Sequence, residues 1–267
     1  MNGTGLLIVN GDDWGREPLT TDRILECRGR GAISSVSAMV FMKDSERAAA
    51  MARERGIDAG LHLNFTTPLS SPGCPARLVE RQQELARYLL GHRFAQAMFH
   101  PGLIRSFEYV VAAQVDEFRR LYGADPDRLD GHHHMHLCAN VVLQGLLPAG
   151  TLVRRNFSFQ AGEKSLWNRL YRRIGDGMLH RRHRLVDFFF SLVPLGLPGR
   201  LQRIVSLARQ FVVEVEAHPV ETEEYLFLAG GEMLRQIGDV QIAPAWAVPR
   251  RGPFPRLSRF GRSPASA

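Results

Sequence analysis

The sequence predicts one α/β domain built on a parallel sheet, because short apolar runs alternate repeatedly with amphipathic stretches. A chain of 267 residues, 45% of them hydrophobic, is long enough for one large barrel or for an open doubly wound sheet. No G-x-G-x-x-G or G-x-x-x-x-G-K-S/T motif follows the first apolar run, so the usual signals of a nucleotide-binding fold are missing. We place this domain at residues 1–249 and expect residues 250–267 to form a basic, disordered tail.

The N-terminal part of the chain predicts three strands with two helices between them. Leu6–Val9 is a continuous apolar run, which is typical of a strand buried on both faces. Glu17–Gly31 mixes apolar and charged residues and reaches glycine near its end, which predicts a helix. Val36–Phe41 predicts a second strand, the alanine-rich Ser45–Arg55 a second helix, and Ala59–Phe65 a third strand.

The rest of the chain continues this alternation. Thr66–Pro75 contains three prolines and is expected to be a loop. Gln82–Leu90 and Ser106–Tyr122 have the apolar spacing of amphipathic helices. Further strands are predicted at Arg128–His136, which includes a turn, at Leu152–Phe157 and at Phe211–Ala217.

Positive charge is concentrated in two places. The formal net charge is +7, yet residues 250–267 contain five arginines and no acid, and residues 154–184 contain nine lysines and arginines against two acids. The remainder of the chain is therefore net negative. Solvated faces are the commonest reason for such runs, and contact with an anionic substrate or lipid surface is the next. We expect no nucleic acid partner, because no recognition motif is present.

The chain is expected to be a cytoplasmic protein. Cys27, Cys74 and Cys138 are widely spaced and form no C-x-x-C pair, which indicates neither a disulfide framework nor a thiolate zinc site. Phe188–Leu197 is the most apolar late stretch, but it contains proline and falls short of the roughly 20 residues that span a bilayer. We expect no membrane span, while peripheral membrane contact and a homodimer stay open.

Adjacent carboxylates, Asp12 and Asp13, close the first predicted strand. Two such groups after a buried strand are costly unless a cation or a proton separates their roles, although aspartate before a helix is also a common N-cap. Neighbours in a strand point to opposite faces, but in the bend after it both can reach one cavity. His62 stands between two leucines, where a lone histidine is usually a core residue, so it indicates a site only together with partners.

The strongest single signal is a run of four imidazoles within His132–His136. In an extended strand His132, His134 and His136 share one face, and in a helix His132 and His136 do so. Either geometry offers two nitrogens to one cation. The sequence therefore favours a metal site over a surface cluster of histidines.

The last predicted strand ends at His218, which Pro219 follows. Active sites of parallel α/β sheets lie at this carboxyl edge, and Glu214 or Glu216 is placed to orient the imidazole. Taken together, the four segments offer an Asp/His/His metal set, a second aspartate as base and a distal histidine as acid. That combination is typical of metal-assisted hydrolysis.

With these motifs the sequence resembles the YdjC-like carbohydrate deacetylases, in the family's order and over residues 6–219. The matching segments are Asn10–Gly15 (NGDDWG), Gly60–Asn64 (GLHLN), Asp130–His136 (DGHHHMH) and Glu216–Pro219 (EAHP). Gly11 and Trp14 stand where the family usually has Ala and Phe, and Arg128 stands where many members have His.

The resemblance implies an irregular (β/α) barrel-like single domain of the glycoside hydrolase/deacetylase type that removes the N-acetyl group of an acetylated amino sugar. It implies one divalent metal ion, Mg or Zn before Mn, Co or Ni. The implied metal ligands are Asp13, His62 and His132, the implied general base is Asp12, the implied general acid is His218, and the residues expected to bind substrate are Arg154 and His136.

Two other functions stay open from the sequence. A metallophosphoesterase is the first, because Gly-Asp-Asp and the histidine run faintly resemble two of its motifs, but Asp-x-His and Gly-Asn-His are missing. A non-catalytic basic scaffold that binds nucleic acid or acidic lipid is the second, on the strength of the two basic segments.

Overall fold

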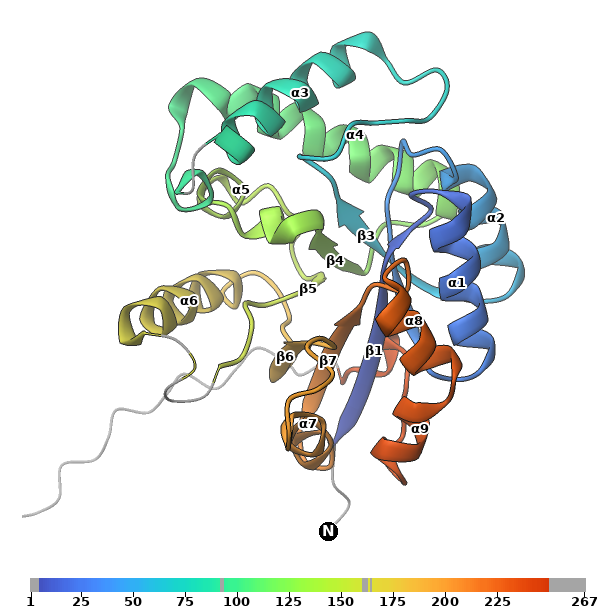
Figure 1. Cartoon of the computed structure of the whole chain (residues 1–267). Helices are drawn as coiled ribbons and strands as arrows, with labels where there is room; N and C mark the ends of the chain where they lie inside the picture. Colours follow the sequence, from blue (N-terminus) through green and yellow to red (C-terminus); the bar gives the residue numbers. More distant parts are fainter. Residues whose placement is uncertain (1–4, 92–93, 160–162, 164, 250–267) are drawn as a thin grey trace, which may run out of the picture.

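Seven parallel strands form one curled sheet in the order β5-β4-β3-β2-β1-β7-β6 (Figure 1). The computed structural model describes residues 5–91, 94–159, 163 and 165–249, so the expected tail at residues 250–267 lies outside the described residues. The strands follow chain order around an incomplete barrel that is open between β5 and β6. This confirms the expected irregular (β/α) barrel.

The strands and helices alternate as the sequence predicts. The strands are β1 Leu6–Trp14, β2 Ser35–Ala38, β3 Asp58–Leu63, β4 Arg128–Gly131, β5 Leu152–Val153, β6 Phe188–Ser191 and β7 Val212–Ala217. The α-helices are α1 Pro18–Gly29, α2 Ser45–Glu54, α3 Ala76–Gly91, α4 Ile104–Tyr122, α5 Ala139–Gln144, α6 Leu166–Leu179, α7 Arg200–Ala208, α8 Thr222–Ala229 and α9 Glu232–Ile237. Short 3-10 turns are η1 Ala95–Ala97, η2 Pro101–Leu103, η3 His132–Leu137 and η4 Ala245–Ala247.

Several features differ from the expectation, among them helices α5 to α9, which the sequence did not predict. The strand expected at Leu152–Phe157 is only two residues long. Its neighbour β4 ends at Gly131, so the hydrogen bonds between the two strands stop at Arg154, whose backbone N donates to Leu129 O at 3.0 Å. The apolar stretch Phe188–Leu197 supplies β6, an element that the sequence did not predict. No helix among the described parts of the chain is long and apolar enough to cross a membrane.

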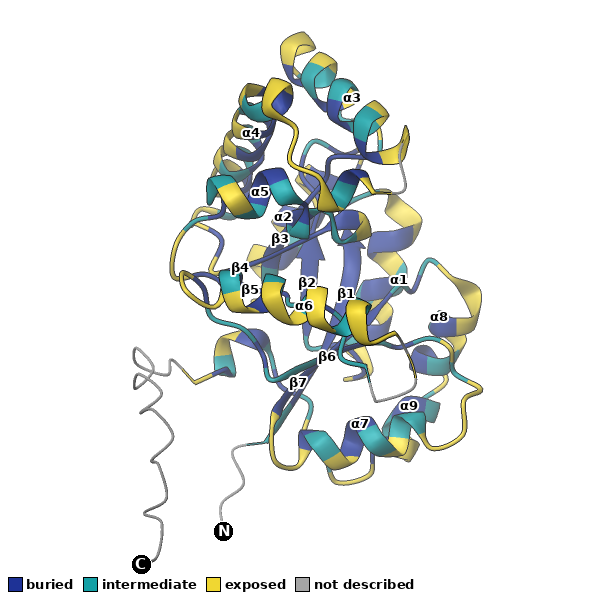
Figure 2. Ribbon diagram, turned by 90° about the vertical axis from the view of Figure 1, so that its left-hand side faces the viewer, coloured by how far each residue is buried: buried dark blue, intermediate teal, exposed yellow. Residues whose placement is uncertain are grey.

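Inward-facing side chains of the barrel form an apolar layer below and a polar layer above. Ile8 of β1 packs in a small core with Leu152, Phe189 and Val212, which fills the lower part. Two residues further along β1, Asn10 donates to Ser37 Oγ at 2.7 Å, and polar residues replace apolar ones from there upward. The larger core lies between the outside of the sheet and the helices, so the strands are buried on both faces (Figure 2).

Gly60 on β3 creates the space for one of the buried charges in this polar layer. A Cβ atom at this position would lie 2.9 Å from Cζ of Arg128. Arg128 instead passes over the glycine, and its guanidinium donates to Val36 O at 2.6 Å and to Ser37 Oγ at 3.1 Å. Arg128 is thus a structural brace inside the barrel, directly beneath the histidines described next.

Candidate metal centre and active site

Asp13, His62 and His132 come together from three different strand ends. Their ligand atoms all lie within 4.8 Å of one another, and all three residues are buried. Oδ1 of Asp13 is 2.9 Å from Nδ1 of His132 and 3.4 Å from Nε2 of His62. One carboxylate and two imidazoles at one point form a donor set suited to a divalent cation.

Unusual backbone conformations aim these side chains. The pairing of β1 with β2 shifts register between Gly11 and Trp14, and Asp13 has a φ of 67° in the left-handed region. This bend lets Asp12 and Asp13, adjacent in sequence, reach one cavity. His133 and His134, with φ of 53° and 56°, likewise break η3. The histidine run is therefore neither a strand nor a regular helix, the two geometries considered from the sequence.

Asp130 fixes the orientation of the His62 ring. Its Oδ1 lies 2.7 Å from Nδ1 of His62, which leaves Nε2 to face Asp13. A carboxylate behind a histidine is the common arrangement around metals, because it sets the tautomer and strengthens the ligand. Burial alone would lower the pKa of His62, but the charge of Asp130, the close carboxylate of Asp13 and the charge of Asp12 raise it to about 10. Asp130 was not among the predicted site residues, although it opens the Asp-Gly-His segment.

The surroundings of this site contain more buried negative than positive charge. The buried carboxylates are Asp12, Asp13, Asp130, Glu214, Glu216 and Glu224, and the buried guanidiniums are Arg128 and Arg154. Burial raises the pKa of Glu214, so a proton can remove one of the negative charges. Buried charge without a partner is costly, and a bound cation is one way to balance it.

The residues present fit a metal ion by a second criterion. Oδ1 of Asp13 is buried and accepts no hydrogen bond, although two ring nitrogens lie close to it. A second cluster of Asp12, His62 and Asp130 is also compact, but its oxygens already accept from Arg154, Ser37 and His62. We therefore take the Asp13 cluster as the candidate metal centre.

Asp12 lies beside this centre and is held by Arg154. Nη1 of Arg154 donates to Oδ2 at 2.6 Å and Nη2 to Oδ1 at 2.8 Å, and Asn10 Nδ2 donates to Oδ1 at 2.5 Å. Burial would raise the pKa of Asp12, but the Arg154 charge outweighs it and the pKa is lowered. Asp12 is thus fixed in place and ionised.

His218 follows β7 and approaches Asp12 from the other side. Its Nε2 lies 3.8 Å from Asp12 Oδ2, and its side chain is 31% exposed. Burial would lower the pKa of His218, but the charges of Asp12, Glu216 and Glu224 raise it. The imidazole is therefore favoured in its protonated form.

The acid that supports His218 is not one of the two expected from the sequence. Glu224, on α8, accepts the backbone N–H of His218 at 2.8 Å, and its other oxygen is 3.8 Å from Nδ1. Glu214 and Glu216 instead pair with Arg154, at 2.8 and 3.2 Å. Their side chains point into the barrel with Arg154, whereas His218 has already left the strand.

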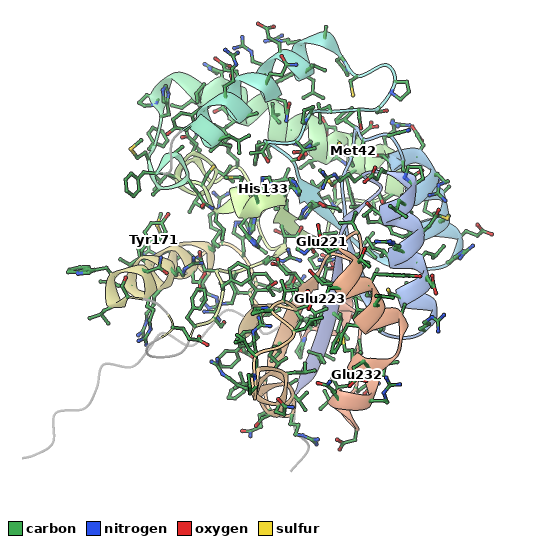
Figure 3. All side chains as sticks on the ribbon, viewed as in Figure 1. Met42, His133, Tyr171, Glu221, Glu223 and Glu232 are labelled. Atoms are coloured by element: carbon green, nitrogen blue, oxygen red, sulfur yellow. The ribbon has the colours of Figure 1, made fainter. Side chains whose placement is uncertain are left out.

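A pocket of about 420 Å³ opens beside the candidate metal centre, between η3 and α6. His133 and His134 line its inner end, and Asn168, Tyr171 and Arg172 of α6 line its outer wall. Figure 3 shows His133 near the middle of the molecule and Tyr171 on α6. His134 also stacks edge-on against Phe157, with ring centroids 4.7 Å apart. These two histidines line the pocket, and the sequence did not predict this position for either of them.

Arg154 and His136, the two residues expected to bind substrate, do not line this pocket. Arg154 is 1% exposed and surrounded by carboxylates. His136 is fully buried, and its Nε2 lies 2.9 Å from the carbonyl oxygen of Arg154. Burial lowers the pKa of His136 to about 3, so it is neutral. Both residues lie beneath the site rather than in its wall.

A barrel of parallel strands with carboxylates and imidazoles at the carboxyl ends defines a class of hydrolase-like domains, and the comparison with known proteins narrows it. The model of the YdjC-like protein family matches residues 6–231. The chain therefore belongs to the YdjC-like family.

Two curated relatives carry deacetylase names. The chain is 32% identical over 132 residues to a chitooligosaccharide deacetylase of Proteus mirabilis, a match that covers 49% of this chain and 50% of that protein. It is 26% identical over 244 residues to a carbohydrate deacetylase of Enterococcus faecalis, with 88% of each chain covered. The match with the Proteus protein thus spans about half of that relative's length.

A solved structure supports the fold. A protein of Enterococcus faecalis V583, proposed to act in cellobiose-phosphate cleavage, superposes with a TM-score of 0.60 at 20% identity. The superposition covers 90% of this chain and 97% of the other. At this identity the likeness concerns the fold, an incomplete barrel of the same kind.

Proposed function

We propose that this protein is a metal-dependent hydrolase that removes an N-acetyl group from an acetylated amino sugar. The observation that carries the proposal is the meeting of the Asp13 cluster with Asp12 and His218 at the carboxyl end of the barrel. The deacetylase names of the family relatives support the same chemistry. An oligosaccharide or glycoconjugate is the proposed substrate class.

Asp13, His62 and His132 would hold the metal ion, with Mg or Zn as the first candidates. When bound by these residues, a divalent ion would supply Lewis-acid chemistry, the polarisation of an acetyl carbonyl and a lowered pKa of a water molecule. The imidazoles favour Zn, and Mn, Co or Ni are further candidates. Asp130 keeps His62 in the tautomer that presents Nε2.

Asp12 and His218 would divide the proton transfers between them. Asp12, ionised, accepts a proton from the water that attacks the acetyl carbon. His218, protonated, donates a proton to the sugar nitrogen as the carbon–nitrogen bond breaks, which releases acetate and an amine. Asp12 Oδ2 and His218 Nε2 are 3.8 Å apart, so the proton on Asp12 can return to His218 through a small movement or one water. The pair is then reset for another turnover.

Arg154 would act on the reaction through Asp12 rather than by touching the sugar. Its two hydrogen bonds hold both oxygens of Asp12 and favour the ionised form. His136 holds the carbonyl oxygen of Arg154 and so supports the same residue from below. We accordingly assign both as positioning residues, and place the sugar against His133 and His134 in the pocket.

The proposal is tested by mass spectrometry of metal-loaded protein with a panel of N-acetylhexosamine compounds, including N-acetylated chitooligosaccharides. Loss of one acetyl group, with equal release of acetate, is the expected result. p-Nitrophenyl phosphate provides the control for a metallophosphoesterase. Phosphate release without any deacetylation would favour that alternative, and metal-free protein that only binds heparin would favour the basic scaffold.

A further inference from the structure

Helix α6 turns its apolar face outward. Its large apolar residues are strongly exposed: Leu166 74%, Trp167 80%, Leu170 45%, Tyr171 51% and Ile174 57%. At 100° per residue they occupy an arc of about 140° on one side of the helix. Helices of water-soluble domains normally bury this face. We call these five residues the apolar face of α6, and the exposed surface of α6 is visible in Figure 2.

The polar face of α6 is fixed against the barrel, so the helix is not free to turn. Asp176 is buried on that inner side, and it accepts from the backbone N and the side-chain Nδ2 of Asn156, both at 2.9 Å. It also pairs with Arg155 Nη2 at 2.8 Å. Rotation of α6 to bury its apolar face would break these bonds and leave a buried carboxylate unpaired. The outward face is therefore a built feature of the fold.

The exposed charged residues on α6 and just beyond its C-terminal end are positive, whereas Glu163, which precedes the helix, lies 3.7 Å from Arg203 Nη1. Arg173 is exposed at its edge, and Arg181 and Arg182 are exposed just beyond the end of the helix. The one acidic residue within α6 is Asp176, which is buried on the opposite side. The aromatic residues Trp167 and Tyr171 combine an apolar ring with a polar atom, as residues at membrane interfaces commonly do.

We propose that the apolar face of α6 docks onto an anionic bilayer surface, with the helix lying in the headgroup region. An apolar arc with aromatic residues, flanked by arginine and lacking exposed acid, is the pattern of interfacial amphipathic helices. A second copy of this chain fits less well, because a two-fold contact between two α6 helices would bring two cationic edges together. Trp167 and Ile174 stand at the centre of the arc and would enter deepest.

Docking in this way places the pocket beside the membrane. α6 connects β5 to β6 and lies where the barrel is open. The same helix supplies Asn168, Tyr171 and Arg172 to the wall of the pocket that reaches His133. This inference concerns binding alone and does not depend on the proposed deacetylation.

The test is co-sedimentation of the full chain with vesicles of phosphatidylcholine, with and without phosphatidylglycerol. The chain should bind the anionic vesicles and lose that binding as salt is raised, because salt screens the electrostatic part. Ile174→Glu should lower the partition coefficient by about tenfold or more, since an apolar contact becomes a repelled charge. Leu226→Glu is the matched control, because Leu226 on α8 is 61% exposed and Ile174 is 57% exposed. Its binding should be unchanged.

A fluorescence measurement shows which residue enters the lipid. In Trp246→Phe protein, Trp167 is the exposed tryptophan and Trp14 is fully buried. Brominated anionic lipid should quench Trp167, and Ile174→Glu should abolish the quenching. Equal binding by the Ile174→Glu and Leu226→Glu proteins would overturn the proposal. A second result would also overturn it: light scattering shows a wild-type dimer, Ile174→Glu converts it to monomers, and neither protein binds vesicles. The apolar face of α6 would then be an interface between two copies of the chain.

Discussion

Arg154 donates to both carboxylate oxygens of Asp12, Nη1 to Oδ2 at 2.6 Å and Nη2 to Oδ1 at 2.8 Å. The two residues come from strand β1 and from the end of β5, and both are almost fully buried. Such a bidentate pair fixes position and charge together, which a single ammonium group cannot reproduce. Through this pair, a buried residue inside the barrel fixes the position and the charge of the proposed general base.

Arg154→Lys should lower kcat while KM and bound metal change little, because Asp12 loses its fixed position but the pocket and the metal ligands stay. We expect a loss of about tenfold or more, as for other misplaced catalytic groups. Arg105→Lys, at an exposed arginine of α4, is the control and should be silent. A rise in KM with unchanged kcat would instead return Arg154 to the substrate-binding role expected from the sequence.

Asp12→Asn and Asp13→Asn should have different consequences although the residues are neighbours. Asp12→Asn removes the base and should lower turnover by about 10²–10⁴-fold with metal retained. Asp13→Asn removes a ligand charge and should lower the metal content itself. Metal analysis of the purified proteins beside their turnover separates the two effects. Reversed phenotypes would exchange the roles of base and ligand.

Asp130→Asn should weaken metal affinity about 10–100-fold, because the carboxylate behind His62 is lost while all three proposed ligands remain. Isothermal titration of chelator-treated protein with Zn measures this affinity. Ser37→Ala is a milder control, since Ser37 Oγ donates to the other oxygen of Asp130 at 2.5 Å. An unchanged affinity in Asp130→Asn would exclude the orienting role.

His218→Ala should nearly abolish deacetylation of an amide while sparing much of the hydrolysis of an activated aryl acetate. An amine leaves poorly without a proton, whereas a phenolate needs none. Metal content should be unaffected, because His218 lies outside the Asp13 cluster. Glu224→Gln should reproduce a weaker form of the defect, since Glu224 holds the backbone N–H of His218. Equal losses on both substrates would remove the acid role.

The sequence predicts most of this architecture from local patterns. The alternation of apolar runs and amphipathic stretches predicts a parallel α/β sheet, barrel or open, and the family resemblance adds the barrel and the residues that meet around Asp13. The adjacent aspartates after a buried strand were expected to share a cavity, and the left-handed Asp13 provides the bend that does so.

Partners that depend on long-range contacts were not predictable from the sequence. Glu224 of α8 accepts the backbone N–H of His218. Glu216, which was expected to orient His218, pairs with Arg154 inside the barrel instead. The burial of Arg154 could be recognised only in the structure, where β1 and β7 pair beside it. Helix α6 was not predicted for a different reason. Its polar side faces the protein and its apolar side faces outward, which is the reverse of the pattern by which a helix that packs on the core is recognised.

The most direct test of the metal centre is acetate release measured together with bound metal on the same chelator-treated protein. Adding Zn or Mg stepwise should restore acetate release from an N-acetylated chitooligosaccharide in proportion to occupancy and stop at one ion per chain. The His132→Ala protein should recover neither metal nor activity. Full acetate release by metal-free wild-type protein, or by metal-free His132→Ala, would contradict the account.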